Sequence, residues 1–255
     1  MYYAGVDIGA ITAKAAILDD NRLVASAVIA AGYNRAEAAR QVLALALQQA
    51  GLAREDIVRL VATGYGRVQV PGADRTVTEI TCHARGAHWL CPDVRTVIDI
   101  GGQDSKGIAV NAAGKVVDFV MNDKCAAGTG RFLEVMAHAL EEDLDRFGEL
   151  SLSAPRQATI SSTCTVFAES EVVTHIAAGV PKPEIIAGIH EAIAARIASM
   201  VARIPVRDVV MLTGGVARNV GVARMLEEKL GRTVIVLPEA QITGAIGAAL
   251  IAGGW

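Results

Sequence analysis

The sequence predicts an α/β fold built from two similar halves, and three observations lead to this prediction. A stretch of chain around Asp7 recurs around Asp99, 92 residues further on. Apolar runs typical of strands alternate with helical periodicity along the 255 residues. The chain is 52% apolar but only 4% aromatic, which favours close packing of helices on sheets over a pocket walled by aromatic rings.

The repeat aligns an Asp, a Gly and a Lys between two apolar strands. Its first copy is VDIGAITAK (residues 6–14) and its second is IDIGGQDSK (residues 98–106). Residues 23–29 and 116–121 are predicted to form the third strand of each half. One Asp-x-Gly hairpin is common in proteins, but two copies with aligned Asp, Gly and Lys indicate a duplicated domain.

The remaining elements follow along the chain. Asn34 and Glu37 form a capping-box-like start for a helix that reaches about residue 50, where Gly51 ends it. Further helices are predicted over residues 76–90, 126–142, 167–178, 182–204, 216–230 and 242–252. Further strands are predicted over residues 58–62, 209–213 and 234–237. No low-complexity linker interrupts this pattern.

Two domains are predicted, with a boundary near residues 92 and 93. Residues 1–92 form the first half, and a helix within residues 241–255 can cross back to complete it. Residues 93–240 form the second half and carry two of the four cysteines.

Composition excludes several kinds of partner. The net charge is −3 and no basic run is present, which argues against nucleic acid and anionic membranes. Neither a signal peptide nor a segment long enough to span a bilayer is visible, so a cytoplasmic location is expected. Four cysteines in such a chain do not indicate a disulfide framework.

Three glycine turns predict a nucleotide site. Glycine lets backbone N–H groups approach phosphate oxygens, and an Asp at the preceding strand end can hold hydrated Mg²⁺. Both repeats have this arrangement, and Gly214 and Gly215 add a third turn between a strand and a helix. Together the turns resemble the family of actin, sugar kinases and heat-shock ATPases. That resemblance implies two ribonuclease-H-like halves that close on ATP.

The resemblance also implies roles for individual residues. Asp7 and Asp99 are expected to orient Mg²⁺ and water, and either Gln103 or Asp104 to position the attacking water. Lys14 and Lys106 are expected to touch phosphate, and a solvated position on the hairpin remains the alternative for each. The residues expected to contact ATP or ADP are Gly9, Ala10, Ile11, Thr12, Lys14, Gly101, Gly102, Lys106, Gly128, Gly130, Gly214 and Gly215.

The first turn departs from the family pattern. Ala10 and Ile11 stand where this family often has hydroxyl side chains. Phosphate contact at these two positions is therefore expected from backbone N–H groups alone.

Cys125 and Cys164 predict metal or redox chemistry. Each lies among small polar residues just ahead of a predicted helix, whose positive N-terminal end favours a thiolate. Their separation of 39 residues excludes a local C-x-x-C motif, and two thiols are too few for the usual four-thiolate cluster. A symmetric dimer would supply the other two.

The other two cysteines have a plainer interpretation. Cys82 and Cys91 are expected to be small buried hydrophobic residues, because the histidines between them do not complete a usual zinc spacing. Glu79 and His83 stand four residues apart and are interpreted as a pair on one helix face.

Three motifs carry a more specific resemblance. NDKCAAGTGRFLE (residues 122–134), SSTCTVFAESEV (residues 161–172) and DIGGQDSK (residues 99–106) resemble the ATP-dependent activators of 2-hydroxyacyl-CoA dehydratases. Benzoyl-CoA reductase nucleotide-binding subunits and double-cubane protein reductases share the pattern. The resemblance implies that Cys125 and Cys164 bind one [4Fe-4S] cluster between the two subunits of a homodimer.

The implied activity is ATP-driven electron transfer in an anaerobic organism. Reduced ferredoxin or flavodoxin would supply the electron, and an acceptor iron–sulfur enzyme, either a dehydratase or a double-cubane protein, would receive it at low potential. A benzoyl-CoA reductase-type subunit remains an alternative within this class. A small-molecule (sugar) kinase and a non-redox ATPase switch of the same fold remain open outside it, but they leave the cysteine motifs unexplained.

Overall fold

The computed structural model describes residues 1–161 and 164–255, and it contains two sheets of the same design. The first sheet, in the order β3-β2-β1-β4-β5, consists of β1 (Tyr2–Ile8), β2 (Thr12–Asp19), β3 (Arg22–Ala30), β4 (Ile57–Thr63) and β5 (Arg75–Thr76). The second, in the order β10-β9-β6-β7-β8, consists of β6 (Thr96–Ile100), β7 (Ser105–Val110), β8 (Val116–Asn122), β9 (Val210–Thr213) and β10 (Val234–Ile235).

The pairing within each sheet repeats residue by residue. In each half an antiparallel hairpin places the repeat's Asp opposite its Lys, so Asp7 faces Lys14 and Asp99 faces Lys106. A parallel strand then lies on the other side of the Asp-bearing strand, namely β4 beside β1 and β9 beside β6. The predicted duplication of an α/β half is therefore confirmed.

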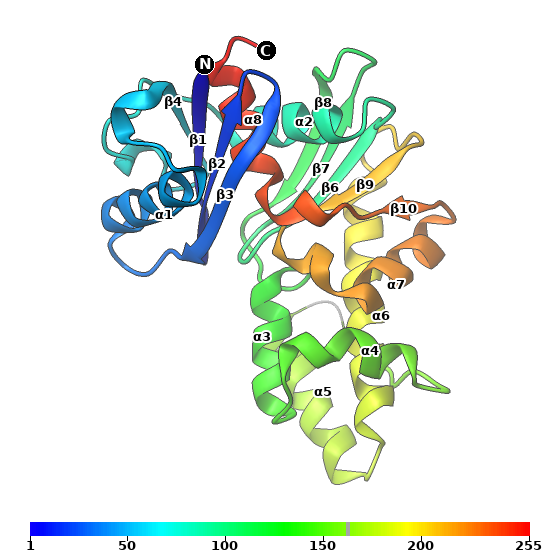
Figure 1. The fold of residues 1–255 in the computed structure, drawn as a ribbon. Helices are drawn as coiled ribbons and strands as arrows, with labels where there is room; N and C mark the ends of the chain where they lie inside the picture. The colour runs from blue at the N-terminus through cyan, green and yellow to red at the C-terminus, as the bar shows by residue number, and fades with distance from the viewer. Residues whose placement is uncertain (162–163) are drawn as a thin grey trace.

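Two helices separate the sheets. α2 (Glu79–Leu90) and α8 (Thr243–Ala252) pack against each other between them (Figure 1). Their backbones meet at glycines: a Cβ on Gly86 would lie 2.1 Å from the Thr243 carbonyl oxygen, and one on Gly247 would lie 1.8 Å from that of Cys82. No larger residue fits at either crossing point.

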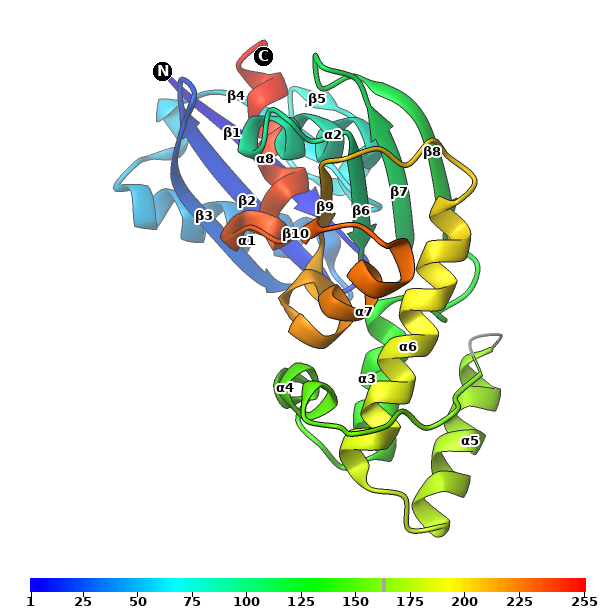
Figure 2. The same cartoon turned by 90° about the vertical axis from the view of Figure 1, so that its right-hand side faces the viewer.

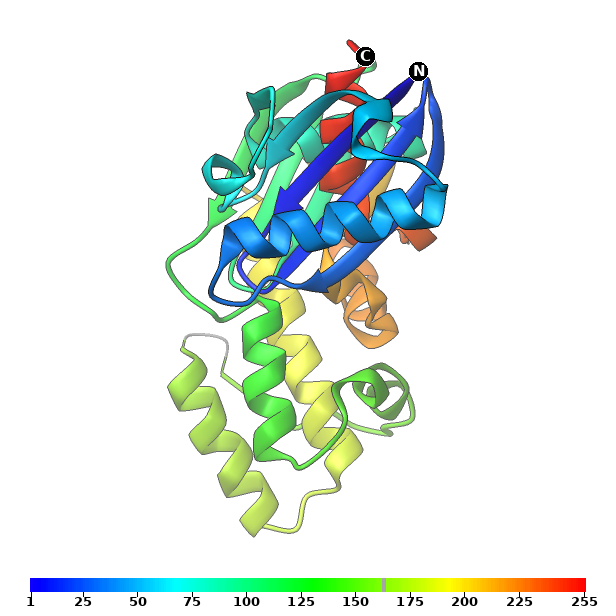
Figure 3. The same cartoon turned by 60° about the vertical axis from the view of Figure 1, so that its left-hand side comes forward.

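The outer face of the first sheet is covered by α1 (Arg35–Ala50), as Figure 3 shows. The Asn34 side chain accepts a hydrogen bond from the Glu37 backbone N–H at 3.1 Å. Gly51 ends the helix with a φ of 68°. The cap at Asn34 and the end at Gly51 confirm the prediction, but the capping box is not completed, because the Glu37 side chain accepts from Arg40 and Gln41 instead.

A helical lobe is inserted between β8 and β9. Its helices are α3 (Gly130–Ala139), α4 (Phe147–Leu152), α5 (Thr165–Ala177) and α6 (Lys182–Val201), and α7 (Val220–Leu230) follows β9. α6 packs against β7 and β8 and extends from the second sheet into the lobe (Figure 2). Its apolar side chains share one core with α3, α4 and the second sheet. The lobe and the second half therefore share one hydrophobic core.

Several predicted boundaries differ from the structure for local reasons. α3 begins at Gly130 instead of residue 126, because Gly128 has a φ of 84° and Thr129 takes the cap position. α7 begins at Val220, where Asn219 caps it by accepting from two backbone N–H groups, and a 3-10 turn (Gly215–Arg218) precedes it. α2 begins at Glu79, and the short α4 was not predicted.

The last helix packs on β1, β2 and β4 of the first sheet. The division of the chain at residues 92 and 93 stays a prediction. Within the described ranges 1–161 and 164–255, no helix is long and apolar enough to cross a membrane.

Candidate nucleotide cleft and cysteine site

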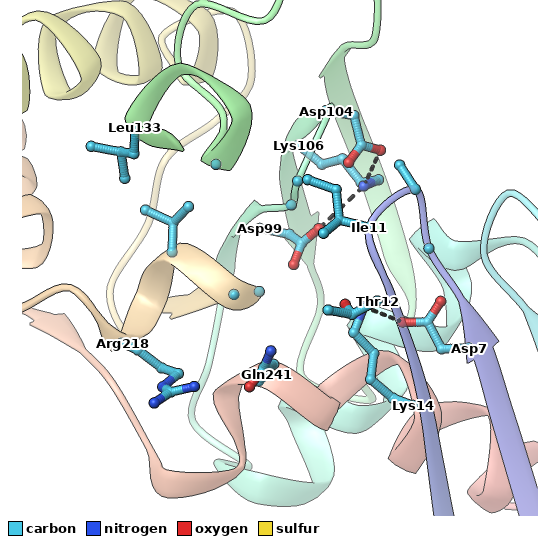
Figure 4. A pocket seen from close by; sticks show the side chains of 18 of the residues that line it. Asp7, Ile11, Thr12, Lys14, Asp99, Asp104, Lys106, Leu133, Arg218 and Gln241 are labelled. Atoms are coloured by element: carbon cyan, nitrogen blue, oxygen red, sulfur yellow. Dashed lines mark hydrogen bonds and ion pairs between the residues drawn. The ribbon is translucent and has the colours of Figure 1, made fainter. Parts of the chain in front are cut away.

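A cleft of about 480 Å³ lies between the two sheets and the start of the helical lobe. Side chains of β1, β2, β6 and β7 line it, together with the turns that follow β1 and β6 (Figure 4). It therefore gathers residues from both copies of the repeat. Of the predicted site residues, those that line it are Asp7, Gly9, Ala10, Ile11, Thr12, Lys14, Asp99, Gly101, Gly102, Asp104, Lys106, Gly130, Gly214 and Gly215.

The first half contributes a partly buried ion pair. Lys14 Nζ lies 3.3 Å from Asp7 Oδ2. β4 ends beside them at Gly64, which has a φ of 84° and whose Cβ would lie 2.4 Å from Asp7 Oδ1. Gly214 repeats this arrangement beside Asp99 in the second half, with a φ of 88°. Each half thus brings a glycine backbone close to its carboxylate, which leaves room for a ligand.

Lys106 organises the second half of the cleft. Its side chain is only 2% exposed, and its Nζ lies 3.1 Å from Asp99 Oδ2, 2.5 Å from Asp104 Oδ2 and 3.5 Å from Glu79 Oε2. Burial acts to lower the pKa of Lys106, but the surrounding carboxylates outweigh it and raise that pKa. The alternative of a solvated hairpin residue is therefore wrong for Lys106.

Asp99 is held in the ionised form. Burial alone would raise its pKa, but His83 and Lys106 outweigh burial and bring the pKa well below the usual range. The Thr213 hydroxyl donates a hydrogen bond to Asp99 Oδ1 at 3.0 Å. Asp99 is thus a carboxylate whose two oxygens are both oriented by neighbours.

Glu79 and His83 belong to the cleft, which sequence reasoning missed. They lie on one face of α2, as their spacing predicted, but their ion-pair partners are Lys106 and Asp99 instead of each other. Burial raises the pKa of Glu79. Their spacing of four residues was the available signal, but it did not reveal that this helix face turns towards the repeats.

The opposite side of the cleft suits a nucleoside. It combines apolar and polar side chains from α3, from the 3-10 turns at Leu144–Arg146, Gly215–Arg218 and Pro238–Ile242, and from the cap of α7. Only the two residues from α3 lie in a motif that the sequence analysis quotes. The residues on this side are Leu133, Glu134, Leu144, Asp145, Val216, Arg218, Asn219 and Gln241.

Two predicted residues lie outside this cleft. Gln103 is exposed and does not line it, whereas the adjacent Asp104 is buried within it. Gly128 instead forms the bend ahead of α3. Of the two residues considered for the attacking water, only Asp104 therefore lies in the cleft.

The two predicted cysteine ligands lie at one end of the helical lobe. Cys164 is the N-cap residue of α5, and Cys125 precedes the bend that opens α3. α3 and α5 pack against each other with their N-terminal ends at the same side of the lobe (Figures 1 and 3). Both cysteines are partly buried and unbonded, while Cys82 is fully buried and burial raises its pKa to about 12.

The cysteine end of α3 is bonded directly to the nucleotide cleft. The Gly130 N–H donates to the Gly101 carbonyl, and the Arg131 N–H donates to the Gly102 carbonyl, both at 2.8 Å. On the other side, the Asn122 amide donates to the Cys125 carbonyl at 2.8 Å. The N-terminus of α3 therefore contacts the second glycine turn directly, and the loop that carries Cys125 leads into the same helix end.

No three His, Cys, Asp or Glu side chains within residues 1–161 and 164–255 form a ready metal cage. Mg²⁺ commonly uses one or two carboxylates together with water and phosphate oxygens, so such a cage is not needed for a magnesium–nucleotide site. Two thiols in each chain fit a cluster that is shared between chains.

A two-lobed cleft with paired Asp–Gly turns defines this molecule as a phosphate-handling protein of the actin and sugar-kinase fold. The chain belongs to the BadF/BadG/BcrA/BcrD ATPase family, whose model matches residues 4–252. It is 48% identical over 253 residues to an activator of lactoyl-CoA dehydratase from Anaerotignum propionicum, covering 99% of this chain and 97% of the relative.

Solved structures agree with this assignment. Component A of (R)-2-hydroxyglutaryl-CoA dehydratase from Acidaminococcus fermentans superposes with a TM-score of 0.96, at 46% identity, covering 100% of this chain and 98% of that one. The activator of 2-hydroxyisocaproyl-CoA dehydratase from Clostridium difficile with bound ADPNP gives 0.95, at 45% identity, covering 100% and 95%.

More distant matches include a benzoyl-CoA reductase subunit and a sugar kinase, the two kinds of protein that the sequence analysis kept as alternatives. A subunit of benzoyl-CoA reductase from Thauera aromatica is 36% identical over 210 residues, which cover 80% of this chain and 74% of the relative. A ROK-family glucokinase from Streptomyces griseus has a TM-score of 0.60 at 14% identity and covers all of both chains. That last likeness establishes the shared fold alone.

Proposed function

We propose that this protein is an ATP-hydrolysing iron–sulfur protein that passes a low-potential electron to a partner enzyme, a 2-hydroxyacyl-CoA dehydratase. The observation that carries this proposal is the position of α3. Its N-terminal backbone is bonded to the second glycine turn, and Cys125 lies just ahead of it beside the start of α5. Relatives of 46–48% identity that are named as dehydratase activators or an activating ATPase support the choice of partner.

The charges of the cleft suit a magnesium–nucleotide complex. Six carboxylate side chains line it against three cationic ones, Lys14, Lys106 and Arg218, so an excess of negative charge is available to a divalent cation. We assign Asp7 and Asp99 to the cation and its waters, and Asp104 to the attacking water. Before the nucleotide binds, Lys14 and Lys106 balance part of the carboxylate charge. When it binds, phosphate oxygens would take the place of some of these carboxylates as partners of the two lysines.

The glycine turns would hold the phosphates through backbone N–H groups. Gly9, Gly101 and Gly214 lie in turns that open onto the cleft. Ala10 and Ile11 add no hydroxyl there, so main-chain donors make these contacts. Gly215, at the start of the following 3-10 turn, would face the nucleoside.

The cysteine end of the lobe suits a second copy of the chain. α5 buries only Ala168 and Val172, while Val166, Phe167, Val173 and Ile176 are exposed along it. Exposed apolar side chains on one helix are typical of a protein interface. In a homodimer, Cys125 and Cys164 of each subunit would provide the four thiolates of one [4Fe-4S] cluster, which supplies one-electron chemistry when bound.

Nucleotide state would reach the cysteines through main-chain contacts. Closure of the two halves on ATP moves the Gly101 and Gly102 turn, and the two carbonyls of that turn hold the start of α3. A shift of this helix start changes the position of Cys125 relative to α5. A ferredoxin or flavodoxin as donor, and an iron–sulfur enzyme as acceptor, complete the proposed electron path.

The test is the iron and acid-labile sulfide content of anaerobically purified protein, together with its mass in solution. We expect about two irons per chain in a dimer, the value for one four-iron cluster shared by two chains. ATP-dependent reduction of a dehydratase by this protein would then identify the acceptor. A colourless, iron-free protein after reconstitution would leave an ATPase or kinase without redox function.

A further inference from the structure

The cleft contains one imidazole, His83, that the proposed roles do not use. Its side chain is 5% exposed and comes from α2, the helix that connects the first half to the second. Histidines buried among carboxylates are uncommon unless they hold a defined contact, because each polar atom removed from water needs a partner.

His83 contacts the carboxylate of the second half through Nδ1. This nitrogen lies 3.4 Å from Asp99 Oδ1 and 3.5 Å from the Thr213 hydroxyl, which itself donates to Asp99. The shorter of these two contacts joins the ring to Asp99, whose carboxylate can accept a hydrogen bond from this nitrogen. Asp99 Oδ1 therefore accepts a hydrogen bond from Thr213 and lies within ion-pair distance of His83, while Lys106 holds the other oxygen.

The opposite nitrogen of the ring lies towards the first half. A Cβ on Gly244, in the first turn of α8, would lie 2.9 Å from His83 Nε2 and 3.1 Å from Asp7 Oδ2. Gly244 thus leaves a space that the imidazole and the Asp7 carboxylate both border. The imidazole stands between the two carboxylates that occupy equivalent positions in the repeat.

We propose that His83 is a positioning residue for the magnesium–nucleotide site, which orients Asp99 on the second sheet towards the cation that it shares with Asp7 on the first. This inference rests on the proposed nucleotide function. His83 does not touch the nucleotide, and it acts through Asp99.

The experiment measures binding of ADP to the full-length protein by calorimetry, with excess Mg²⁺ and with EDTA. The variants are His83→Ala, His83→Asn, which places an amide N–H near the former Nδ1, and His83→Gln, which places one near Nε2. His88→Asn is the matched control, because His88 is on the same helix and outside the cleft. Circular dichroism verifies that each variant is folded.

We expect His83→Ala and His83→Gln to weaken Mg²⁺–ADP binding by about tenfold, the scale of one lost hydrogen bond to a charged group. Binding in EDTA should change less than twofold, and His83→Asn should recover most of the Mg²⁺-dependent affinity. If His83→Ala does not fold, the contrast between His83→Asn and His83→Gln still decides the question.

Equal losses with Mg²⁺ and with EDTA would overturn the inference, because they would indicate a purely structural role. Indistinguishable His83→Asn and His83→Gln variants would also overturn it. Failure of the unmodified protein to bind ADP at all would instead reject the nucleotide function on which the inference rests.

Discussion

Lys106 is stable in a buried position because three carboxylates surround its ammonium group. Lys14 occupies the equivalent place in the first half with a single carboxylate partner, Asp7. The repeat therefore uses one sequence position in two electrostatic settings. Removing Lys106 leaves several carboxylates close together without a balancing charge, which is costly in the interior.

We expect Lys106→Met to lower the free energy of unfolding by about 3–5 kcal/mol, the range for breaking a buried charge network. Lys14→Met should cost less, since it leaves one carboxylate unpaired. Urea denaturation at neutral pH measures both variants. A smaller loss for Lys106→Met than for Lys14→Met would contradict this description of the cleft.

The proposed cysteine ligands make a second prediction at the residue scale. Cys125→Ala and Cys164→Ala should each remove the bound iron, because neither leaves four thiolates in a dimer. ADP binding should persist, since neither side chain lines the cleft. Iron analysis and calorimetry on the same samples test both statements.

The other cysteines provide controls for these variants. Cys91→Ala changes a partly buried thiol outside the proposed site, and Cys82→Ala changes a fully buried one. Both should retain iron, although Cys82→Ala is expected to cost about 1 kcal/mol of stability through lost packing. Loss of iron in either control would mean that the ligand pair is wrongly assigned.

His190 gives the helical lobe a predictable response to acid. It is buried on α6, with Nδ1 2.8 Å from the Ser151 hydroxyl and Nε2 3.1 Å from the Asn219 amide nitrogen. Burial lowers its pKa from 6.5 to about 3. Below pH 6.5 the unfolded chain binds a proton that the folded chain does not, so stability falls as the pH drops through this interval.

The expected loss from His190 is about 1.4 kcal/mol for each pH unit below 6.5, or about 2 kcal/mol at pH 5. His190→Gln should remove this part of the pH dependence, whereas His138→Gln, at an exposed position, should not. Urea denaturation at pH 7.5 and pH 5 gives the comparison. Identical pH dependence in His190→Gln and the unmodified protein would show that the imidazole is not held neutral by the fold.

At the scale of elements, cap residues and repeats were predictable from the sequence, whereas contacts between distant elements were not. Asn34 and Gly51 mark the ends of α1 because capping is a local interaction. The late start of α3 depends on the left-handed Gly128, which a helical pattern alone does not reveal. The cleft residues Glu79 and His83 depend on how α2 sits between the two sheets, which is a tertiary property.

The start of α3 offers a test of coupling at this scale. Arg131→Pro removes the N–H that donates to Gly102, and proline is compatible with the second position of a helix, as Pro183 in α6 demonstrates. We expect the variant to bind iron and nucleotide normally. The rate at which a chelator removes iron is measured with ATP and with ADP. We expect the ratio of these two rates to be severalfold smaller in Arg131→Pro than in the unmodified protein.

Arg131→Ala is the matched control, because it removes the side chain and keeps the N–H. The Arg131 side chain forms a surface ion pair with Glu134 at 3.1 Å, whose contribution to stability is small. If ATP and ADP change the rate of iron removal from Arg131→Pro as much as from the unmodified protein, the hydrogen bond from the Arg131 N–H to the Gly102 carbonyl is not part of the coupling path.

At the scale of the whole molecule, the two halves are joined where α2 crosses α8. Glycines at this crossing let the backbones touch, and the Asp-bearing strands lie on either side of it. The same pair of helices supplies Glu79, His83 and Gly244 to the cleft region. The spacing of these helices therefore sets both the packing between the halves and the geometry of the proposed nucleotide site.

Gly247→Ala should accordingly affect stability and nucleotide binding together. Its new methyl group would lie 1.8 Å from the Cys82 carbonyl oxygen, which belongs to a backbone that cannot move without shifting α2. We expect a loss of about 3 kcal/mol or more, at the upper end of the range for overpacking. The affinity for Mg²⁺–ADP should fall as well, because the displaced helix carries His83 and Glu79.

Gly32→Ala also adds a methyl group, but at a site with no atom within 4 Å, and it should cost only about 1–2 kcal/mol of backbone strain at its φ of 56°. Unchanged ADP affinity in a folded Gly247→Ala protein would mean that the cleft does not depend on the spacing of these two helices.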